Sequence, residues 1–285
     1  MLKKIRFIDI LKTSWAILKR NKKLLFFSLV PTVILGFLPL GFLIFLLHYF
    51  YIQEKIPTNP LVYILFFVFF IISLFLYFFF KIALIYSVNN LLRNEKVNLQ
   101  ESLKIARKYF KKIIRWEFFD VSFRLGVSAP YRKEMGPAEA LPIFTIISSW
   151  HFLTIFVPFI LIIEDFSIKE AIIKSSQLFK KTIKDTAILE YSFGPIFAII
   201  GIGGVFLIPI LLMLFESPFI IQHAIAVAII SYGLLIVGIM IAGMIVATLR
   251  EIFMIILYRY AISGEMPAVF SKKENIQKEK EMEKW

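Results

Sequence analysis

The stretch that decides the fold is IIRWEFFDVSFRLGV, residues 113–127. It is apolar enough to form a membrane helix, yet it carries four charged side chains, Arg115, Glu117, Asp120 and Arg124. A charged side chain costs about 2.5–3.5 kcal/mol at the centre of a membrane helix on insertion scales. The stretch is therefore a span with paired charges, a helix on the membrane surface or part of an active site, and the rest of the chain discriminates between these.

The chain as a whole is too apolar for a soluble domain. Hydrophobic residues make up 59% of its 285 residues, whereas soluble domains contain about 45–50%. The excess is concentrated in long runs that can cross a bilayer as helices. This pattern predicts an all-α, polytopic transmembrane helix bundle. The runs lie near residues 24–53, 61–91, 141–163, 186–214 and 219–249.

The motifs of common enzymes are missing from the sequence. The chain has no cysteine, which excludes disulfides, thiol catalysis and iron–sulfur clusters. It contains no GxSxG, HExxH or phosphate-binding loop, and its three scattered histidines lack the spacing of a zinc site. We therefore expect no catalytic residue, no cofactor and no metal, and a protein that is not an enzyme.

The placement of basic residues predicts the topology. Cytoplasmic loops of membrane proteins are enriched in Lys and Arg. We therefore expect a multi-pass protein of the cell membrane with both termini in the cytoplasm. The net charge of +13 then indicates contact with anionic lipid headgroups rather than with nucleic acid. Of the 33 Lys and Arg residues, 27 lie in four segments, 1–23, 92–112, 164–185 and 248–285.

This topology requires the opening stretch to cross the membrane. Segment 92–112 is expected inside, and the run at 141–163 must begin outside to place 164–185 inside. Only residues 113–130 are available for the missing crossing, and a helix of that length reaches roughly 27 Å, close to the hydrocarbon thickness. The sequence thus predicts about six spans, with 113–130 as the third.

An internal repeat gives the same count. QESLKIARKYFKKII (100–114) aligns without gaps on KEAIIKSSQLFKKTI (169–183), and Asn98-x-x-Glu101 and Ser167-x-x-Glu170 are capping boxes that begin a helix. We expect three units, each an amphipathic helix in the membrane interface followed by a two-span hairpin. These helices are expected near residues 5–21, 98–112 and 167–184.

The basic ends of these helices are candidate contacts for lipid headgroups. We expect the acidic pair Glu164 and Asp165 to interact with nearby lysines of the amphipathic helices. Residues 1–264 then form a single transmembrane domain, and 265–285 form a charged cytoplasmic tail. The candidate lipid contacts are Lys19, Arg20, Lys111, Lys112, Lys180 and Lys181.

Four segments carry a resemblance to a known family. They are SWAILKRNKKLLFF (14–27), KIALIYSVNNLLRNEKVNLQESLKIA (81–106), VPFILIIEDFSIKEAIIKSSQLFKKT (157–182) and LYRYAISGEMPAVF (257–270). With these segments, the chain resembles an uncharacterised, domain-of-unknown-function family of six-span prokaryotic membrane proteins. More distantly, it is similar to the membrane domain of glycerophosphodiester phosphodiesterase-type proteins. The resemblance implies six spans and cytoplasmic termini, and it implies no reaction.

A polar cluster is the candidate functional feature. Glu117, Asp120 and Arg124 are spaced to share one helix face, and His151 lies in the run at 141–163. The cluster is either a polar stripe along an ion or proton path, or an ion pair that locks the third span into the bundle.

The sequence favours a non-enzymatic membrane protein that organises lipid or binds partners, among them a second copy of the chain or another membrane protein. The alternative is a transporter or channel for a small solute or ion, with the polar stripe in span three. An enzyme acting on lipid is the weakest interpretation. A polar cavity touching Asp120 and Arg124 would favour the transporter, and a closed, dry bundle would favour the organiser.

Overall fold

The computed structural model describes residues 7–53, 59–129, 137–183, 186, 188 and 224–264. Every element within these residues is a helix, which confirms the all-α class. The helices are α1 (Phe7–Arg20), α2 (Leu24–Gln53), α3 (Pro60–Leu92), α4 (Leu99–Ser128), α5 (Pro137–Thr154), α6 (Val157–Ile163), a helix over residues 168–183, and α9 (Ala224–Ser263).

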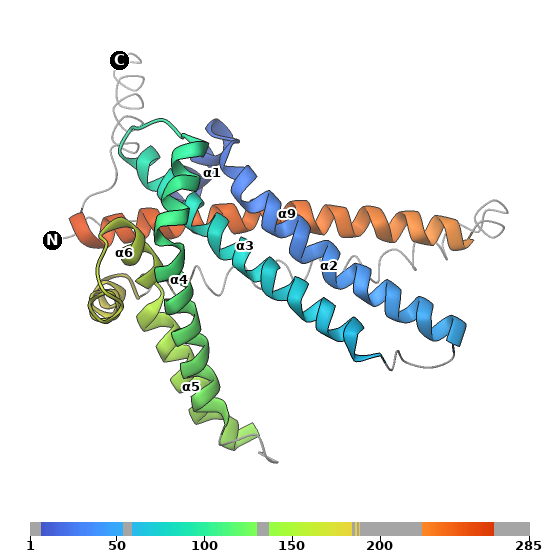
Figure 1. The fold of residues 1–285 in the computed structure, drawn as a ribbon. Coiled ribbons are helices and arrows are strands. Elements are labelled where there is room, and N and C mark those ends of the chain that lie inside the picture. Colours follow the sequence, from blue (N-terminus) through green and yellow to red (C-terminus); the bar gives the residue numbers. More distant parts are fainter. Residues whose placement is uncertain are drawn as a thin grey trace.

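The helices form two arms that diverge from a shared packed end, and the outer part of α9 extends away from both (Figure 1). In one arm, α2 packs against α3 and α9, and in the other α4 packs against α5. The arms meet where α3 contacts α4 and where α6 contacts both of these helices. Helix α1 packs against α9 at the same end.

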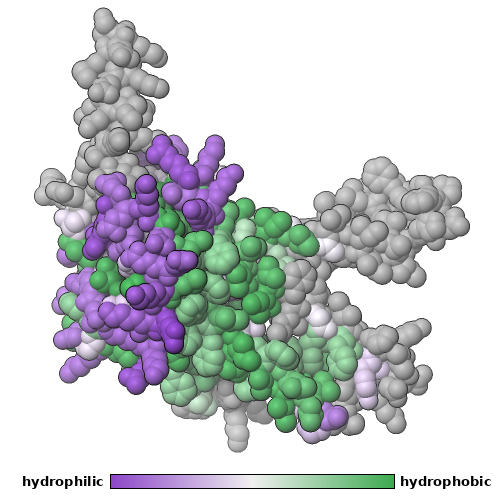
Figure 2. All heavy atoms as spheres, turned by 45° about the horizontal axis from the view of Figure 1, so that its top comes forward, coloured by the Kyte–Doolittle hydropathy of each residue, from purple (hydrophilic) through white to green (hydrophobic). Residues whose placement is uncertain are grey.

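The hydrophobic core lies at this packed end. Its buried residues include Ile85, Ile113, Ile160 and Phe253. They come from α1, the start of α2, the second half of α3, the first half of α4, α6, the 168–183 helix and the last part of α9. The outer halves of the helices instead expose large apolar side chains, for example Phe67 on α3. Figure 2 shows the same division, with hydrophilic side chains gathered at one end and hydrophobic ones along the arms.

The exposed apolar arms identify a membrane protein. Within the described residues, three helical segments are long and apolar enough to cross a membrane, Pro60–Leu92, Leu141–Ile163 and Val237–Ser263, and Leu24–Leu35 is a shorter apolar stretch within α2. Apolar side chains without protein neighbours are stable in hydrocarbon, where a helix satisfies its own backbone hydrogen bonds.

Helix α4 differs from the expected arrangement. The sequence predicts an interfacial helix near 98–112 followed by a separate span at 113–130, whereas α4 runs without interruption from Leu99 to Ser128. No glycine or proline precedes Gly126 in it, so nothing breaks the ladder of hydrogen bonds. Its first half packs on α3, where Ser87 and Ser102 are joined by a 2.6 Å hydrogen bond. Segment 113–130 is not among the helices apolar enough to cross.

Two other boundaries also differ. The run at 141–163 is interrupted after Thr154, because Pro158 cannot donate the backbone hydrogen bond that would join α5 to α6. The last run, expected at 219–249, continues to Ser263 and ends at Gly264, whose φ of 74° suits glycine. The expected span at 186–214 and the tail at 265–285 lie outside the described residues, apart from positions 186 and 188.

The predicted capping box at Ser167 and Glu170 is confirmed, whereas at Asn98 only the N-cap is confirmed, because Glu101 Oε1 accepts from the Tyr86 hydroxyl at 2.6 Å. Asn98 Oδ1 accepts hydrogen bonds from the backbone N–H groups of Gln100 (3.1 Å) and Glu101 (3.3 Å). Ser167 and Glu170 cap each other reciprocally, with the Ser167 N–H donating to Glu170 Oε2 at 3.0 Å and the Glu170 N–H to Ser167 Oγ at 3.4 Å.

The expected contacts of the acidic pair with lysines are confirmed as well. Lys174 donates to Glu164, and Lys112 Nζ lies 2.6 Å from Asp165 Oδ1. These bonds tie the loop before the 168–183 helix to that helix and to α4.

The Lys112–Asp165 pair predicts a pH dependence. Its hydrogen bond holds the pKa of Asp165 below the ordinary value of 3.8. The pair therefore stabilises the fold fully above that ordinary value, and this contribution is lost as the pH falls through the lower folded pKa. We expect Asp165→Asn to flatten the acid limb of a plot of Tm against pH. The exposed Glu95→Gln should leave it unchanged, and an equal effect of both variants would contradict the assignment.

Candidate functional site

A polar cavity of about 120 Å³ opens between the two arms. Five helices contribute to its lining, α3, α4, α5, α6 and α9. Charged side chains shielded from water are costly unless they are paired or serve a ligand. The cavity is lined by three acidic and three basic side chains, Glu117, Asp120, Glu251, Lys81, Arg124 and Arg250.

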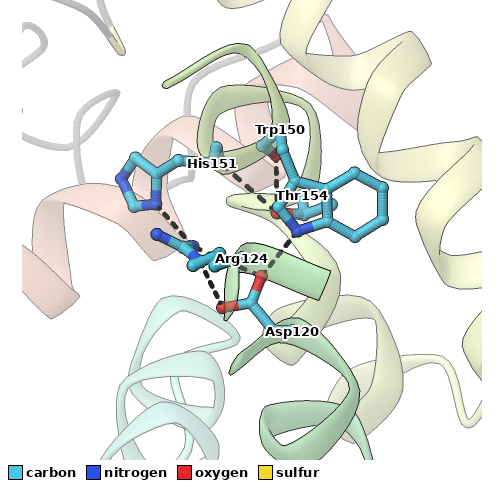
Figure 3. A network of polar contacts seen from close by, with 5 residues as sticks. All are labelled: Asp120, Arg124, Trp150, His151 and Thr154. Carbon is cyan, nitrogen blue, oxygen red and sulfur yellow. Dashed lines mark hydrogen bonds and ion pairs between the residues drawn. The ribbon is translucent and has the colours of Figure 1, made fainter. Parts of the chain in front are cut away.

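One wall of the cavity is a hydrogen-bonded network between α4 and α5 (Figure 3). Arg124 donates to both carboxylate oxygens of Asp120, through Nε at 2.8 Å and Nη2 at 3.3 Å. The indole Nε1 of Trp150 donates to Asp120 Oδ1 at 2.7 Å. Asp120 is only 8% exposed, so these three bonds replace the water that its carboxylate loses.

His151 extends this network. Its Nδ1 lies 3.3 Å from Nη2 of Arg124. A guanidinium has only donors, so Nδ1 accepts this bond and the proton of the neutral ring sits on Nε2. The remaining donor of the neutral ring is then Nε2.

Aromatic packing holds the two helices of this wall together. The Trp150 ring stacks on Phe123 with a centroid distance of 4.0 Å. The centroid of the Trp116 ring lies 6.5 Å from that of Trp150. Such pairs add about 0.5–1.5 kcal/mol beyond the area they bury. The network therefore also stabilises the contact between α4 and α5.

The opposite wall comes from α9 and α3. Glu251 is 7% exposed, and its Oε1 lies 3.5 Å from Nη1 of Arg250. Its other oxygen, Oε2, is buried and has no hydrogen-bond partner among the described residues. An unsatisfied buried polar group costs about 1–3 kcal/mol, and more when it is charged. Glu251 is thus the group in the cavity that most needs a further donor.

The structure brings the predicted polar cluster together and adds to it. Glu117, Asp120, Arg124 and His151 all line this cavity. Sequence reasoning does not find Arg250 and Glu251, because the predicted last span ends at residue 249 and Arg250 falls in the predicted cytoplasmic segment. The signal was present in ATLREIFMIIL (247–257), where two charges interrupt an apolar run that continues beyond them.

The predicted lipid contacts lie elsewhere. Five of these six side chains are exposed. The sixth, Lys112, is half-buried and forms an ion pair with Asp165. Lys181 also donates to the carbonyl oxygen of Ala261 at 3.5 Å. The exposed residues are Lys19, Arg20, Lys111, Lys180 and Lys181.

The described residues hold no group of three or more His, Cys, Asp or Glu side chains arranged to bind a metal ion. What the cavity offers instead is hydrogen bonding and charge. With a neutral His151, the negative charges that line the cavity equal the positive charges in number. The walls of the cavity come from helices that diverge. Such a site can bind a polar group between the arms of the protein.

The apolar arms, the packed end and the cavity define a helical membrane protein with an ionisable site between its helices. Residues 61–268 match a family of unknown function, DUF6159, and the chain belongs to this family. The match includes every residue that lines the cavity. Comparison with curated proteins and with solved structures finds no match. Membership of an uncharacterised family is confirmed, while the distant likeness to glycerophosphodiester phosphodiesterase-type proteins stays a prediction.

Proposed function

We propose that this protein is a non-enzymatic transporter that binds a small polar or ionic solute in the cavity between its two arms. The observation that carries the proposal is the set of six charged side chains around a cavity that Asp120 and Arg124 touch. A purely structural ion pair needs two partners and no cavity. Here several charges from different helices face one space, which is the arrangement expected of a solute site inside a membrane.

The proposal includes a topology. The protein lies in the cell membrane with about six spans, both termini in the cytoplasm and the packed end at the cytoplasmic face. The clustering of hydrophilic side chains at that end (Figure 2) and of Lys and Arg in four segments supports it. In this topology α4 crosses the membrane with Glu117, Asp120 and Arg124 facing the cavity, whereas the exposed Arg115 does not line it.

The transport proposal is tested with the full chain reconstituted in liposomes. Osmotic re-swelling is followed by light scattering with glycine, urea and potassium chloride, and proton flux is followed with entrapped pyranine. We expect at least one of these fluxes to exceed that of empty liposomes. Glu117→Gln should lower it severalfold, because this side chain lines the cavity outside the Asp120 network, while Glu95→Gln should not. Equal fluxes with and without protein would overturn the proposal.

A second candidate function is the organisation of anionic lipid at the packed end. The exposed basic residues of α1, α4 and the 168–183 helix support it, since each Lys or Arg near an anionic surface contributes about 1 kcal/mol. We expect native mass spectrometry to find more bound phosphatidylglycerol than phosphatidylcholine. Replacing Lys19, Arg20, Lys111 and Lys180 by glutamine should remove the difference. If the preference persists, the basic end is not its source.

A further inference from the structure

A second cavity adjoins the polar one. It measures about 420 Å³, lies between α2, α3 and α9, and is lined mainly by apolar side chains such as Phe27, Leu35, Leu84 and Met240. This volume falls within the range of about 300–1,000 Å³ that is typical of small-molecule sites. The cavity belongs to the arm whose outer surface exposes apolar side chains, so a molecule dissolved in the bilayer can approach it.

Three charged side chains belong to both cavities. Lys81, Arg250 and Glu251 line the polar cavity and the apolar cavity alike. They therefore form the boundary between a space suited to a polar head and a space suited to a hydrocarbon chain. A molecule that fills both spaces must be amphipathic, with its change of polarity at these three residues.

Glu251 specifies the head group. Its Oε2 is the buried acceptor that lacks a donor within the described part of the chain. Either a hydroxyl or an ammonium could donate to it. However, the acidic and basic side chains of the polar cavity are equal in number, so a cationic head would add an uncompensated charge inside the membrane. An uncharged hydroxyl satisfies the carboxylate without disturbing this balance.

We propose that the two cavities form one binding site for a single-chain amphipathic molecule with a hydroxyl head. Its hydrocarbon chain lies in the cavity between α2, α3 and α9, and its hydroxyl donates to Glu251 at the boundary. This inference rests on the proposed function only in taking the polar cavity to be a ligand site, and it adds an amphipathic ligand to the small polar or ionic solute proposed above. The limited volume of the apolar cavity fits one chain rather than the two chains of a phospholipid.

The test uses a medium-chain fatty alcohol carrying a diazirine in its chain, added to the full-length protein in nanodiscs. After irradiation, mass spectrometry should locate saturable crosslinks on residues lining the apolar cavity. The unmodified alcohol should compete, whereas the alkane and the trimethylammonium analogue of equal length should not. Crosslinks outside this cavity, or equal competition by the alkane, would overturn the proposal.

Two variants make the test specific. Glu251→Gln should weaken the competition by the alcohol about tenfold, as expected when a hydrogen bond to a charged acceptor is replaced by one to a neutral acceptor. Ala247→Phe should fill the apolar cavity, which Ala247 lines, and abolish labelling. Ile241→Phe is the matched control, because Ile241 is exposed on the same helix and does not line the cavity. Undiminished labelling of Ala247→Phe would exclude this site.

The two proposals can fail separately. Specific labelling by the alcohol without flux of any tested solute would retain the amphiphile site and remove the transport function. Flux of glycine, urea, potassium chloride or protons without specific labelling would retain transport and remove the amphiphile site.

Discussion

Replacing Asp120 by leucine is expected to lower the free energy of unfolding by about 2–3 kcal/mol. Removing one partner of a buried ion pair costs about 3–5 kcal/mol, since the other charge stays behind unpaired. The Arg124 side chain is 33% exposed, and water there offsets part of this cost. The substitution also leaves the Trp150 N–H without its acceptor. Thermal unfolding in detergent, followed by tryptophan fluorescence, measures the change.

Asp165→Asn is the control for this prediction. Asp165 is also ion-paired through a lysine, but at an exposed site, where such pairs contribute about 0–1 kcal/mol. Asparagine is the suitable replacement because Asp165 has a φ of 56°, a conformation that asparagine tolerates well. Equal losses from both variants would mean that burial of the Asp120 pair has no energetic importance.

A double variant separates the two interpretations of the polar cluster. Replacing both partners of a buried pair by apolar residues is often neutral for stability. Asp120→Leu combined with Arg124→Met should therefore recover most of the lost stability. If the pair only locks α4 into the bundle, the double variant keeps its flux. If the pair serves a solute site, the variant folds and its flux stays low, and this is the outcome we expect.

Local features of the fold could be predicted from the sequence because they depend on nearby residues. The caps at Asn98 and Ser167 follow from spacings of three residues, and the lysine contacts of Glu164 and Asp165 follow from their position beside basic helices. The apolar runs identify where helices occur. They do not show where a helix bends or ends, so the break after Thr154 and the extension of α9 to Ser263 were missed.

The cavity could be predicted only in part, for a physical reason. Glu117, Asp120 and Arg124 lie on one helix, so helical periodicity alone places them together. Their meeting with Glu251 and Lys81 depends on how α4, α9 and α3 cross. Crossing angles result from the packing of many side chains at the shared end, and no short-range spacing encodes them.

Replacing Tyr258 by alanine is expected to destabilise the protein by about 3–5 kcal/mol, the range found when a large buried aromatic side chain is removed. Tyr258 is fully buried on α9. Its ring packs against Phe156 and Phe159, at centroid distances of 6.1 and 6.0 Å, and its hydroxyl donates to Glu164. The Tyr258 side chain therefore packs α9 against α6 and the residues that cap it.

Tyr258→Phe and Ile262→Ala divide this effect into its parts. Phenylalanine keeps the ring and removes only the hydrogen bond to the Glu164 carboxylate, so we expect a loss of about 1.5–3 kcal/mol. Ile262 lies on the same helix but is 44% exposed, and its truncation should change stability by no more than about 0.5 kcal/mol. Thermal unfolding of the three variants in one detergent measures the order of their stability losses, which we expect to fall from Tyr258→Ala through Tyr258→Phe to Ile262→Ala.

The consequence of Tyr258→Ala should extend to the cavity. Tyr258 lies two helical turns beyond Glu251 on α9, so loosening this contact also loosens the wall that carries Arg250 and Glu251. We therefore expect the variant to lose flux and alcohol labelling at temperatures where it is still folded. A variant that is destabilised but retains both would show that the cavity is held by the packing of α9 against α2 and α3, independently of its docking on α6.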